Sequence, residues 1–136
     1  IGGYNLTDIS KCLMLKSSKF DVVAAGSGQL YACLALGAKA HTTSEGSVYP
    51  QIFKKIFELF LSNRLEEALT LQRKWILLNA KIPRTSNGEN CAEEKYFLNK
   101  LNICQPWVNE NYETHTIKET SKLDKIHSEI MLLCAS

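Results

Sequence analysis

Residues 20–50 read FDVVAAGSGQLYACLALGAKAHTTSEGSVYP, and the first half of this stretch has the pattern of a strand followed by a helix. An apolar, β-branched run over Phe20–Ala25 ends at the small residues Gly26-Ser27-Gly28. A segment with helical character follows over Gln29–Leu36 and stops at a glycine. This order of strand, small-residue turn and helix predicts the first part of a βαβ unit.

The second half of the stretch repeats the pattern. A short run over Ala40–Ser44 ends at Glu45-Gly46-Ser47, and Pro50 begins a long helical pattern. The two runs therefore predict parallel strands of an α/β fold. Ligands bind at the carboxyl ends of the strands in such sheets, so both small-residue turns are expected where a site would lie.

The flanking sequence predicts one more βα unit before this stretch and a helical region after it. Residues 1–5 are expected to be the end of a strand, with Thr7 or Asp8 capping a helix that ends near Ser17. A helical hairpin is expected over 51–80 with a break at Ser62-Asn63, and two further helices over 91–103 and 120–134. Their expected apolar faces comprise Ala92, Tyr96, Phe97 and Leu101 in the first, and Leu123, Ile126, Ile130 and Leu133 in the second.

Composition excludes several classes of protein. With 136 residues, 45% hydrophobic content and a formal net charge of +2, the chain fits one globular domain or part of one, without a footprint for nucleic acid or an anionic membrane. The longest apolar run is far short of a membrane span. The cysteine count of 5 is odd, and no C-x-x-C occurs, which argues against a disulfide framework or a zinc site and favours a cytoplasmic location. Three cysteines with apolar neighbours are expected in the core, namely Cys12, Cys33 and Cys134.

Closure of the sheet poses a physical problem. Three parallel strands with helices on one side leave two open edges and one uncovered face, whereas parallel sheets are buried on both faces. A closed barrel takes about eight strands and roughly 250 residues. We therefore expect this chain either to be a piece of a longer protein or to pair with another chain.

Several segments, taken in order, resemble one family. They are the strand-and-turn stretch Val22 to Leu30, the turn Ala35 to Lys39, the turn Gly46 to Pro50, the helix Leu65 to Gln72 and the tail Glu93 to Pro106. Together they resemble the C-terminal half of the dihydrodipicolinate synthase / N-acetylneuraminate lyase family, which includes 2-keto-3-deoxygluconate aldolases.

The resemblance implies an α/β fold comprising strands six to eight of a TIM (β/α)8 barrel over residues 1–62 and an added C-terminal helical region over 63–136. It also implies a tetramer that uses no metal and no separate cofactor. The implied activity is class I aldol chemistry, in which a lysine forms a Schiff base with pyruvate or another 2-keto acid.

The chain departs from the family pattern at its first strand. Asn5 stands where the resemblance places the Schiff-base lysine, and Leu6 stands where an acid is usual. An amide nitrogen is not a nucleophile at neutral pH, so Asn5 cannot form an iminium. No catalytic residue is therefore assigned within these residues.

The candidate substrate-binding residues lie in the two turns. Gly26 and Ser27 could cradle a carboxylate or could simply make a tight βα turn. Gly46 and Ser47 correspond to small pocket-lining residues in the resemblance, and Glu45 could bind a substrate hydroxyl or be structural. His41 is placed at the start of its strand, where packing is expected and not general-base chemistry.

Three hypotheses about function stay open. The first is the C-terminal portion of an aldolase or lyase that acts on a 2-keto acid such as 2-keto-3-deoxygluconate. The second is a non-catalytic homologue that binds a ligand or is purely structural, because of Asn5. The third is a half-barrel that dimerises to complete its sheet. The expected partners are a small 2-keto acid and either further copies of the chain in a homo-oligomer or a missing N-terminal half, with neither nucleic acid nor membrane.

Overall fold

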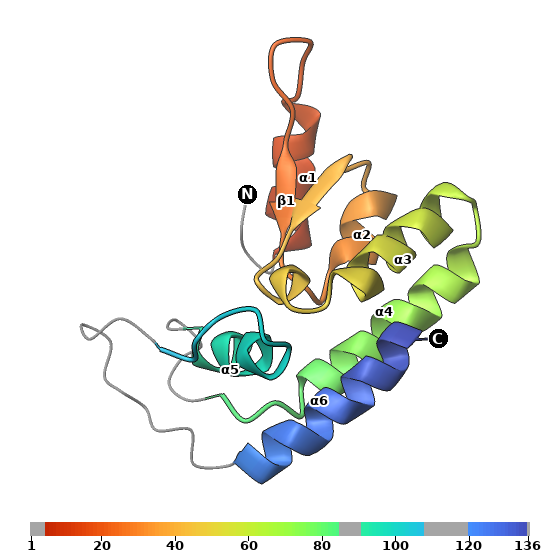
Figure 1. Cartoon of the computed structure of the whole chain (residues 1–136). Coiled ribbons are helices and arrows are strands. Elements are labelled where there is room, and N and C mark those ends of the chain that lie inside the picture. The colour runs from red at the N-terminus through yellow and green to blue at the C-terminus, as the bar shows by residue number, and fades with distance from the viewer. Residues whose placement is uncertain (1–4, 85–90, 108–119, 136) are drawn as a thin grey trace. The chain divides into compact units, whose positions relative to one another are not determined.

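The computed structural model describes residues 5–84, 91–107 and 120–135, and Figure 1 shows their helices and strands. The chain divides into two compact units, Ile1–Ile76 and Leu77–Ser136, and each is described by itself. No helix in the described ranges combines the length and apolar character that crossing a bilayer requires. The same ranges contain no group of three or more His, Cys, Asp or Glu side chains suited to a metal ion.

The first helix, α1 (Leu6–Met14), begins earlier than the sequence suggested. Its N-cap is Asn5, whose side-chain oxygen accepts hydrogen bonds from the N–H groups of Thr7 at 2.9 Å and Asp8 at 3.4 Å. The expectation that Thr7 or Asp8 would cap the helix is therefore wrong. Asparagine is among the strongest N-cap residues because its short side chain reaches the first free N–H groups. Of the strand expected over 1–5, only this last residue is within the described part.

A parallel pair of strands follows. The strand β1 (Val23–Ala25), the helix α2 (Leu30–Ala35) and the strand β2 (Ala40–Thr42) form a βαβ unit, as predicted. Each strand is shorter than the apolar run that predicted it. Within the described residues the sheet has two strands, so one edge of each strand lacks a neighbour.

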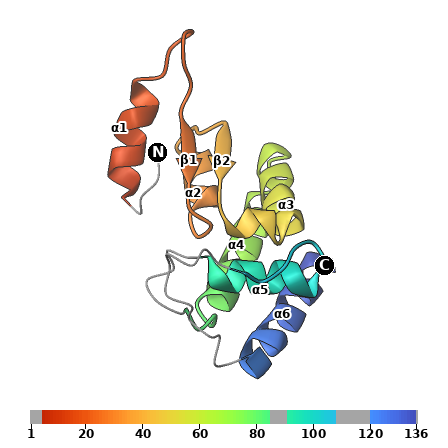
Figure 2. The ribbon, with the colours of Figure 1, turned by 60° about the vertical axis from the view of Figure 1, so that its left-hand side comes forward.

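Alternation along the strands gives the sheet one covered and one open face. Ala24 is fully buried and joins a core cluster with residues of α1 and α2 and the turn before β2, namely Ile9, Leu13, Cys33 and Ala38. Val23, Ala40 and Thr42 point the other way and are exposed. Helices therefore cover the Ala24 face of the sheet, whereas the opposite face stays open in the described unit (Figure 2).

The predicted helical hairpin consists of α3 (Pro50–Leu61) and α4 (Leu65–Asn79). The break between them falls at the predicted place, where Asn63 adopts a left-handed φ of 59°. In the first unit, the fully buried Trp75 of α4 packs edge-on against Phe53 of α3 at 5.1 Å between ring centroids, and lies 6.2 Å from the Tyr49 ring. This aromatic cluster joins α4 to the start of α3.

The second unit contains α5 (Ala92–Lys100) and α6 (Thr120–Ala135). Contacts between them include the Tyr96 hydroxyl, which donates to Asp124 at 2.7 Å, and the Phe97 ring, which stacks on His127 at 5.7 Å. Three of the four predicted inward residues of α6 are buried, namely Leu123, Ile126 and Ile130, whereas Leu133 is half-buried.

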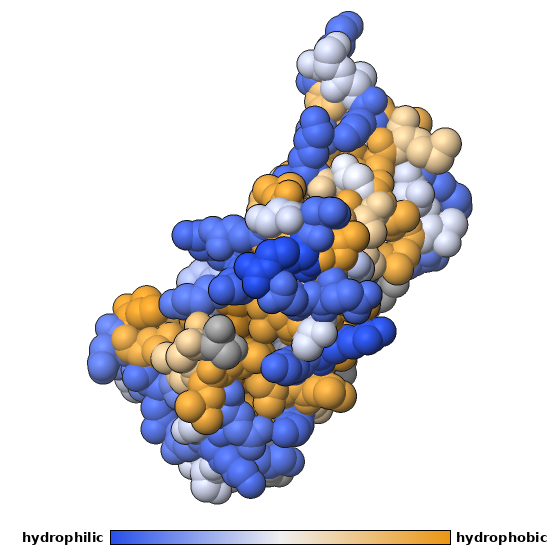
Figure 3. All heavy atoms as spheres, turned by 90° about the vertical axis from the view of Figure 1, so that its right-hand side faces the viewer, coloured by the Kyte–Doolittle hydropathy of each residue, from blue (hydrophilic) through white to orange (hydrophobic). Residues whose placement is uncertain are grey.

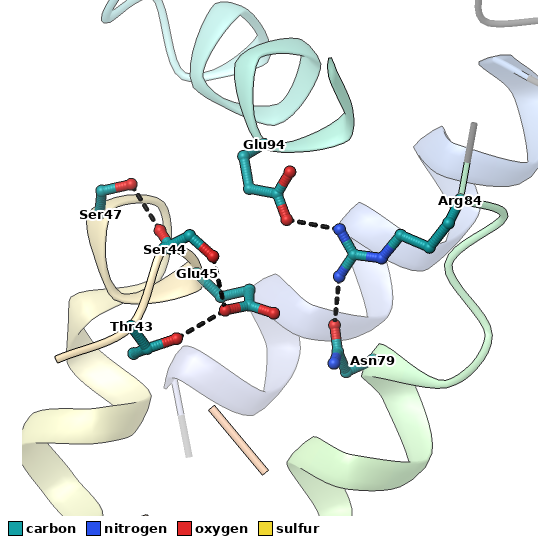
Figure 4. Close-up of polar contacts among 7 residues, drawn as sticks. All are labelled: Thr43, Ser44, Glu45, Ser47, Asn79, Arg84 and Glu94. Atoms are coloured by element: carbon teal, nitrogen blue, oxygen red, sulfur yellow. Dashed lines mark hydrogen bonds and ion pairs between the residues drawn. The ribbon is translucent and has the colours of Figure 1, made fainter. Parts of the chain in front are cut away.

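The buried face of α5 differs from the prediction. Ala92 and Phe97 are buried as expected, but Glu93 and Glu94 are buried with them. Within the second unit, the Arg84 guanidinium pairs with the Glu94 carboxylate and donates to the Asn79 side chain at 2.9 Å (Figure 4). An ion-pair partner outside the helix explains how a carboxylate can lie on a helix face that packs inward.

All five cysteines lie in the described residues, and none of them forms a disulfide bond. Cys33 is fully buried, as expected, while Cys12 and Cys134 are half-buried. Burial raises the pKa of the Cys33 thiol, which keeps it neutral and unreactive.

Apolar side chains also reach the surface of the molecule, where orange patches lie among hydrophilic ones in Figure 3. In the first unit, the exposed apolar side chains include Met14, Leu15, Phe20 and Val23. A cavity of about 340 Å³ lies beside β1 and is lined by Cys12, Leu15 and residues 20–23. The unpaired side of the sheet is therefore rich in apolar surface.

Candidate functional site

The turn after β1 depends on the geometry of Gly26. This residue has a φ of +108°, a conformation that favours glycine, and a Cβ there would lie 3.0 Å from the Gln29 side-chain nitrogen. The Gly26 N–H donates to the Thr42 carbonyl at 3.1 Å, and the Gly26 carbonyl accepts from the Gln29 N–H at 3.2 Å. The turn is thus fixed both to the end of β2 and to the start of α2.

The turn after β2 forms the short 3-10 helix η1 (Glu45–Ser47) and is organised around a carboxylate. One oxygen of Glu45 accepts from the Thr43 hydroxyl at 2.5 Å and from the Ser44 hydroxyl at 3.0 Å (Figure 4). The Ser47 hydroxyl donates to the Ser44 carbonyl at 2.6 Å. Each of these contacts is local, so the sequence of the turn largely specifies its own shape.

The hydroxyl of Ser27 connects the two turns. It lies in the turn after β1, yet it is one of the groups whose hydrogen bonding lowers the pKa of the Glu45 carboxyl. Burial raises the pKa of Glu45, but hydrogen bonds from Thr43, its own backbone N–H, Ser27 and Ser44 outweigh it and bring the pKa below its ordinary value. The structure therefore brings the two predicted turns together around an ionised carboxylate.

Gln72 of α4 supports this arrangement and was not predicted as a functional residue. Its side chain is almost fully buried, donates to the Ser27 carbonyl at 3.0 Å and accepts from the Tyr31 N–H at 3.1 Å. The available signal was a polar residue on the buried stripe Ala68–Gln72–Trp75 of a helix. A buried amide needs partners, and here one partner lies in the turn after β1 and the other in the first turn of α2.

Gly46, also predicted as a pocket residue, has little room for a side chain. A Cβ at this position would lie 3.0 Å from a methyl carbon of Thr43 and 3.8 Å from the Phe53 ring. Ser47 is exposed and Ser44 is exposed beside it. The predicted residues therefore include tightly packed positions and accessible hydroxyl groups.

His41 lies in the middle of β2, beside Ala24 of β1, and not at the start of the strand as expected. It is half-buried, and burial lowers its pKa, although a hydrogen bond to the Gly26 backbone acts in the opposite direction. His41 also lines a cavity of about 470 Å³ that runs along β2 and α3 and includes Thr42, Thr43 and Phe53. Its role in packing stays the simplest interpretation, because it does not lie at the carboxyl end of the strand.

The chemistry available at this end of the sheet is binding and orientation. Residues 26–29 and 43–47 offer hydroxyl groups, one carboxylate, one side-chain amide and backbone groups, but no amine. Asn5, which stands at the expected lysine position, uses its side-chain oxygen to cap α1. Nothing in these segments can form an iminium with a keto acid.

No model of a protein family matches this sequence, and no curated protein sequence matches it. Solved structures do match its fold, and they include two proteins of similar description. A protein of the dihydrodipicolinate synthase family from Coccidioides immitis has a TM-score of 0.78 and 19% sequence identity, over 99% of this chain and 45% of that protein. A Thermus thermophilus protein assigned as a dihydrodipicolinate synthase has a TM-score of 0.72 and 17% identity, over 94% of this chain and 43% of that protein.

The predicted resemblance to dihydrodipicolinate synthase family proteins is therefore confirmed at the level of fold. The α/β class is confirmed as well, with two parallel strands in the described residues. The chain spans less than half the length of these solved proteins.

Proposed function

We propose that this chain forms the C-terminal part of a lyase barrel related to the dihydrodipicolinate synthase / N-acetylneuraminate lyase family. In this proposal residues 1–62 supply strands six to eight, and residues 63–136 form the added helical region. This proposal is supported by one observation: the turns that follow the carboxyl ends of β1 and β2 meet at Glu45, in a fold shared with proteins of that family. The carboxyl ends of barrel strands are where such folds bind their substrates.

The substrate class proposed is a 2-keto acid, such as a 2-keto-3-deoxy sugar acid, with pyruvate released or added. The two turns would form one wall of its pocket through Gly26, Ser27, Glu45, Gly46 and Ser47. Their backbone N–H groups and hydroxyls suit carboxylate, carbonyl and hydroxyl groups of such a molecule. An ionised Glu45 favours substrate hydroxyl groups at this wall over a second carboxylate.

Schiff-base chemistry, if the intact protein has it, would come from a lysine outside the two turns. The role of Asn5 as a helix cap favours a second candidate, a homologue that binds a keto acid without cleaving it. The two candidates share the pocket wall and differ only in the presence of a nucleophilic amine.

Borohydride trapping separates these candidates. The longest natural form of the protein is incubated with pyruvate and borohydride, and the adduct is located by peptide mass spectrometry. An adduct on a lysine outside residues 1–136 supports the aldolase, and binding without an adduct supports the non-catalytic homologue. An adduct on a lysine within residues 1–136 would overturn the proposal that these residues supply only a wall.

The open sheet also bears on partners. In the described residues neither β1 nor β2 has a second neighbouring strand, and a cavity lies beside each of them, which suits additional βα units from a longer polypeptide or a separate chain. We propose that such units cover the exposed face and that the completed protein assembles as a homo-oligomer.

A further inference from the structure

Gln72 occupies a place in the first unit that packing alone does not explain. It is a polar residue with only 3% of its surface exposed, on the same helix stripe as the fully buried Ala68 and Trp75. A leucine or methionine would fill such a position without the cost of desolvating an amide. The amide instead makes two hydrogen bonds, both to residues more than 40 positions earlier in the chain.

These two bonds hold opposite sides of one turn. The Gln72 amide nitrogen donates to the Ser27 carbonyl at 3.0 Å, and its oxygen accepts from the Tyr31 N–H at 3.1 Å. Tyr31 lies in the first turn of α2, where a backbone N–H has no partner within the helix. Gln72 therefore fixes both the turn after β1 and the beginning of the helix that follows.

The turn after β1, which Gln72 holds, also contacts the turn after β2. The Ser27 carbonyl is held by Gln72, and the Ser27 side chain contributes to the lowered pKa of the Glu45 carboxyl. Glu45 also receives the hydroxyls of Thr43 and Ser44. A continuous polar path thus runs from α4, through the turn after β1, to the turn after β2.

We infer that Gln72 is a positioning residue, which sets the orientation of Ser27 and, through Ser27, the placement of the Glu45 carboxylate at the proposed pocket wall. The inference rests on the proposed function for its ligand, a 2-keto acid, but the positioning itself does not depend on any ligand. It assigns to α4 a role in the site, although α4 contributes no group to the strand ends.

The test compares Gln72→Met and Gln72→Leu with the wild type in the full-length protein. Both variants place an uncharged apolar side chain at this position and remove both hydrogen bonds without adding a charge near Glu45. Gln51→Met, at an exposed position of α3, is the matched control. The readouts are the NMR titration of the Glu45 carboxyl, amide hydrogen exchange at Tyr31, and affinity for pyruvate.

We expect Gln72→Met to raise the apparent pKa of Glu45, to speed exchange at Tyr31 and to weaken pyruvate binding several-fold. Gln72→Leu should give the same three changes, and Gln51→Met should change none of them. Ser27→Ala, which removes the hydroxyl at the far end of the path, should give the same Glu45 shift and covers the case in which Gln72→Met does not fold.

Two results would separate a failure of the positioning role from a failure of the proposed keto-acid site. If the Glu45 titration in the folded Gln72 variants, or in Ser27→Ala, is the same as in the wild type, the positioning role is overturned. If the wild-type protein binds no pyruvate while the Glu45 titration moves as expected, the proposed keto-acid site fails and the positioning role stands.

Discussion

At the scale of single residues, the candidate site depends on a few positions whose chemistry admits few replacements. Gly26 provides a backbone conformation that side chains disfavour, and Glu45 gathers hydroxyl donors from two turns. Sequence reasoning selected both, because small residues after apolar runs indicate βα turns. It could not connect them, because a contact between Ser27 and Glu45 depends on the strand register and not on local sequence.

Gly26 offers a direct test of backbone geometry. Gly26→Ala should lower the free energy of unfolding by about 1–3 kcal/mol, because alanine disfavours a positive φ and its Cβ would approach the Gln29 side chain at 3.0 Å. Gly28→Ala is the matched control, since its Cβ would meet only Ile76, at 3.9 Å. Denaturant unfolding of both variants measures the difference, and an equal cost for the two would contradict the strain assigned to Gly26.

The lowered pKa of Glu45 predicts that the stability of the protein depends on pH. Its pKa in the folded state is below the ordinary value of 4.5, so the unfolded chain takes up a proton more readily as the pH falls. The stabilisation that ionised Glu45 provides is therefore complete above pH 4.5, and it is lost as the pH falls through the pKa of Glu45 in the folded state. Glu45→Gln should cost about 1–2 kcal/mol at pH 7 and flatten the stability profile below pH about 5.

The control for this profile is Glu66→Gln, at an exposed position of α4. It should leave the slope between pH about 5 and about 3 close to that of the wild type. A Glu45→Gln profile as steep as the wild-type profile would show that Glu45 is not stabilised in its ionised form.

At the scale of elements, the sequence predicted the order of helices and strands well and their burial less well. The 3.6-residue spacing of apolar residues predicted α3, α4, α5 and α6. It could not predict that Glu93 and Glu94 would be buried, because the Arg84 partner of Glu94 comes from outside the helix. The N-cap of α1 was misplaced because Asn5, Thr7 and Asp8 all have capping side chains, and only backbone geometry selects among them.

The prediction for the helices concerns the aromatic cluster of the helical hairpin. Trp75→Ala should destabilise the protein by about 3–5 kcal/mol, because it removes a fully buried side chain that packs on Phe53 and lies near Tyr49. Trp107→Ala removes the same side chain from a position that is 74% exposed and should cost less than about 0.5 kcal/mol. Thermal unfolding of both variants gives the comparison, and similar losses would contradict the packing described.

At the scale of the whole molecule, the open sheet is the dominant feature. Among the described residues the sheet has two strands and one open face, whereas parallel sheets are normally buried on both faces. The sequence predicted this problem from the number of strands alone, and the solved proteins of similar fold are more than twice as long as the matched region. The sequence could not predict what completes the sheet, because the described residues supply only two strands.

This feature predicts how residues 1–136 behave when expressed by themselves. The exposed apolar side chains near β1 and α1 should drive association, so sedimentation should give an apparent mass above the 15.3 kDa of one chain. A monodisperse species of 15.3 kDa that unfolds cooperatively would contradict the expectation that the sheet needs a cover.

The most direct test of the central claim, that the two turns form the wall of a 2-keto acid pocket, is an amide NMR titration of the longest natural form with pyruvate. We predict saturable shifts at the backbone amides of residues 26–28 and 44–47, with the amides of α6 unchanged. Saturable binding that leaves both turns unshifted would place the keto-acid site elsewhere and contradict the claim.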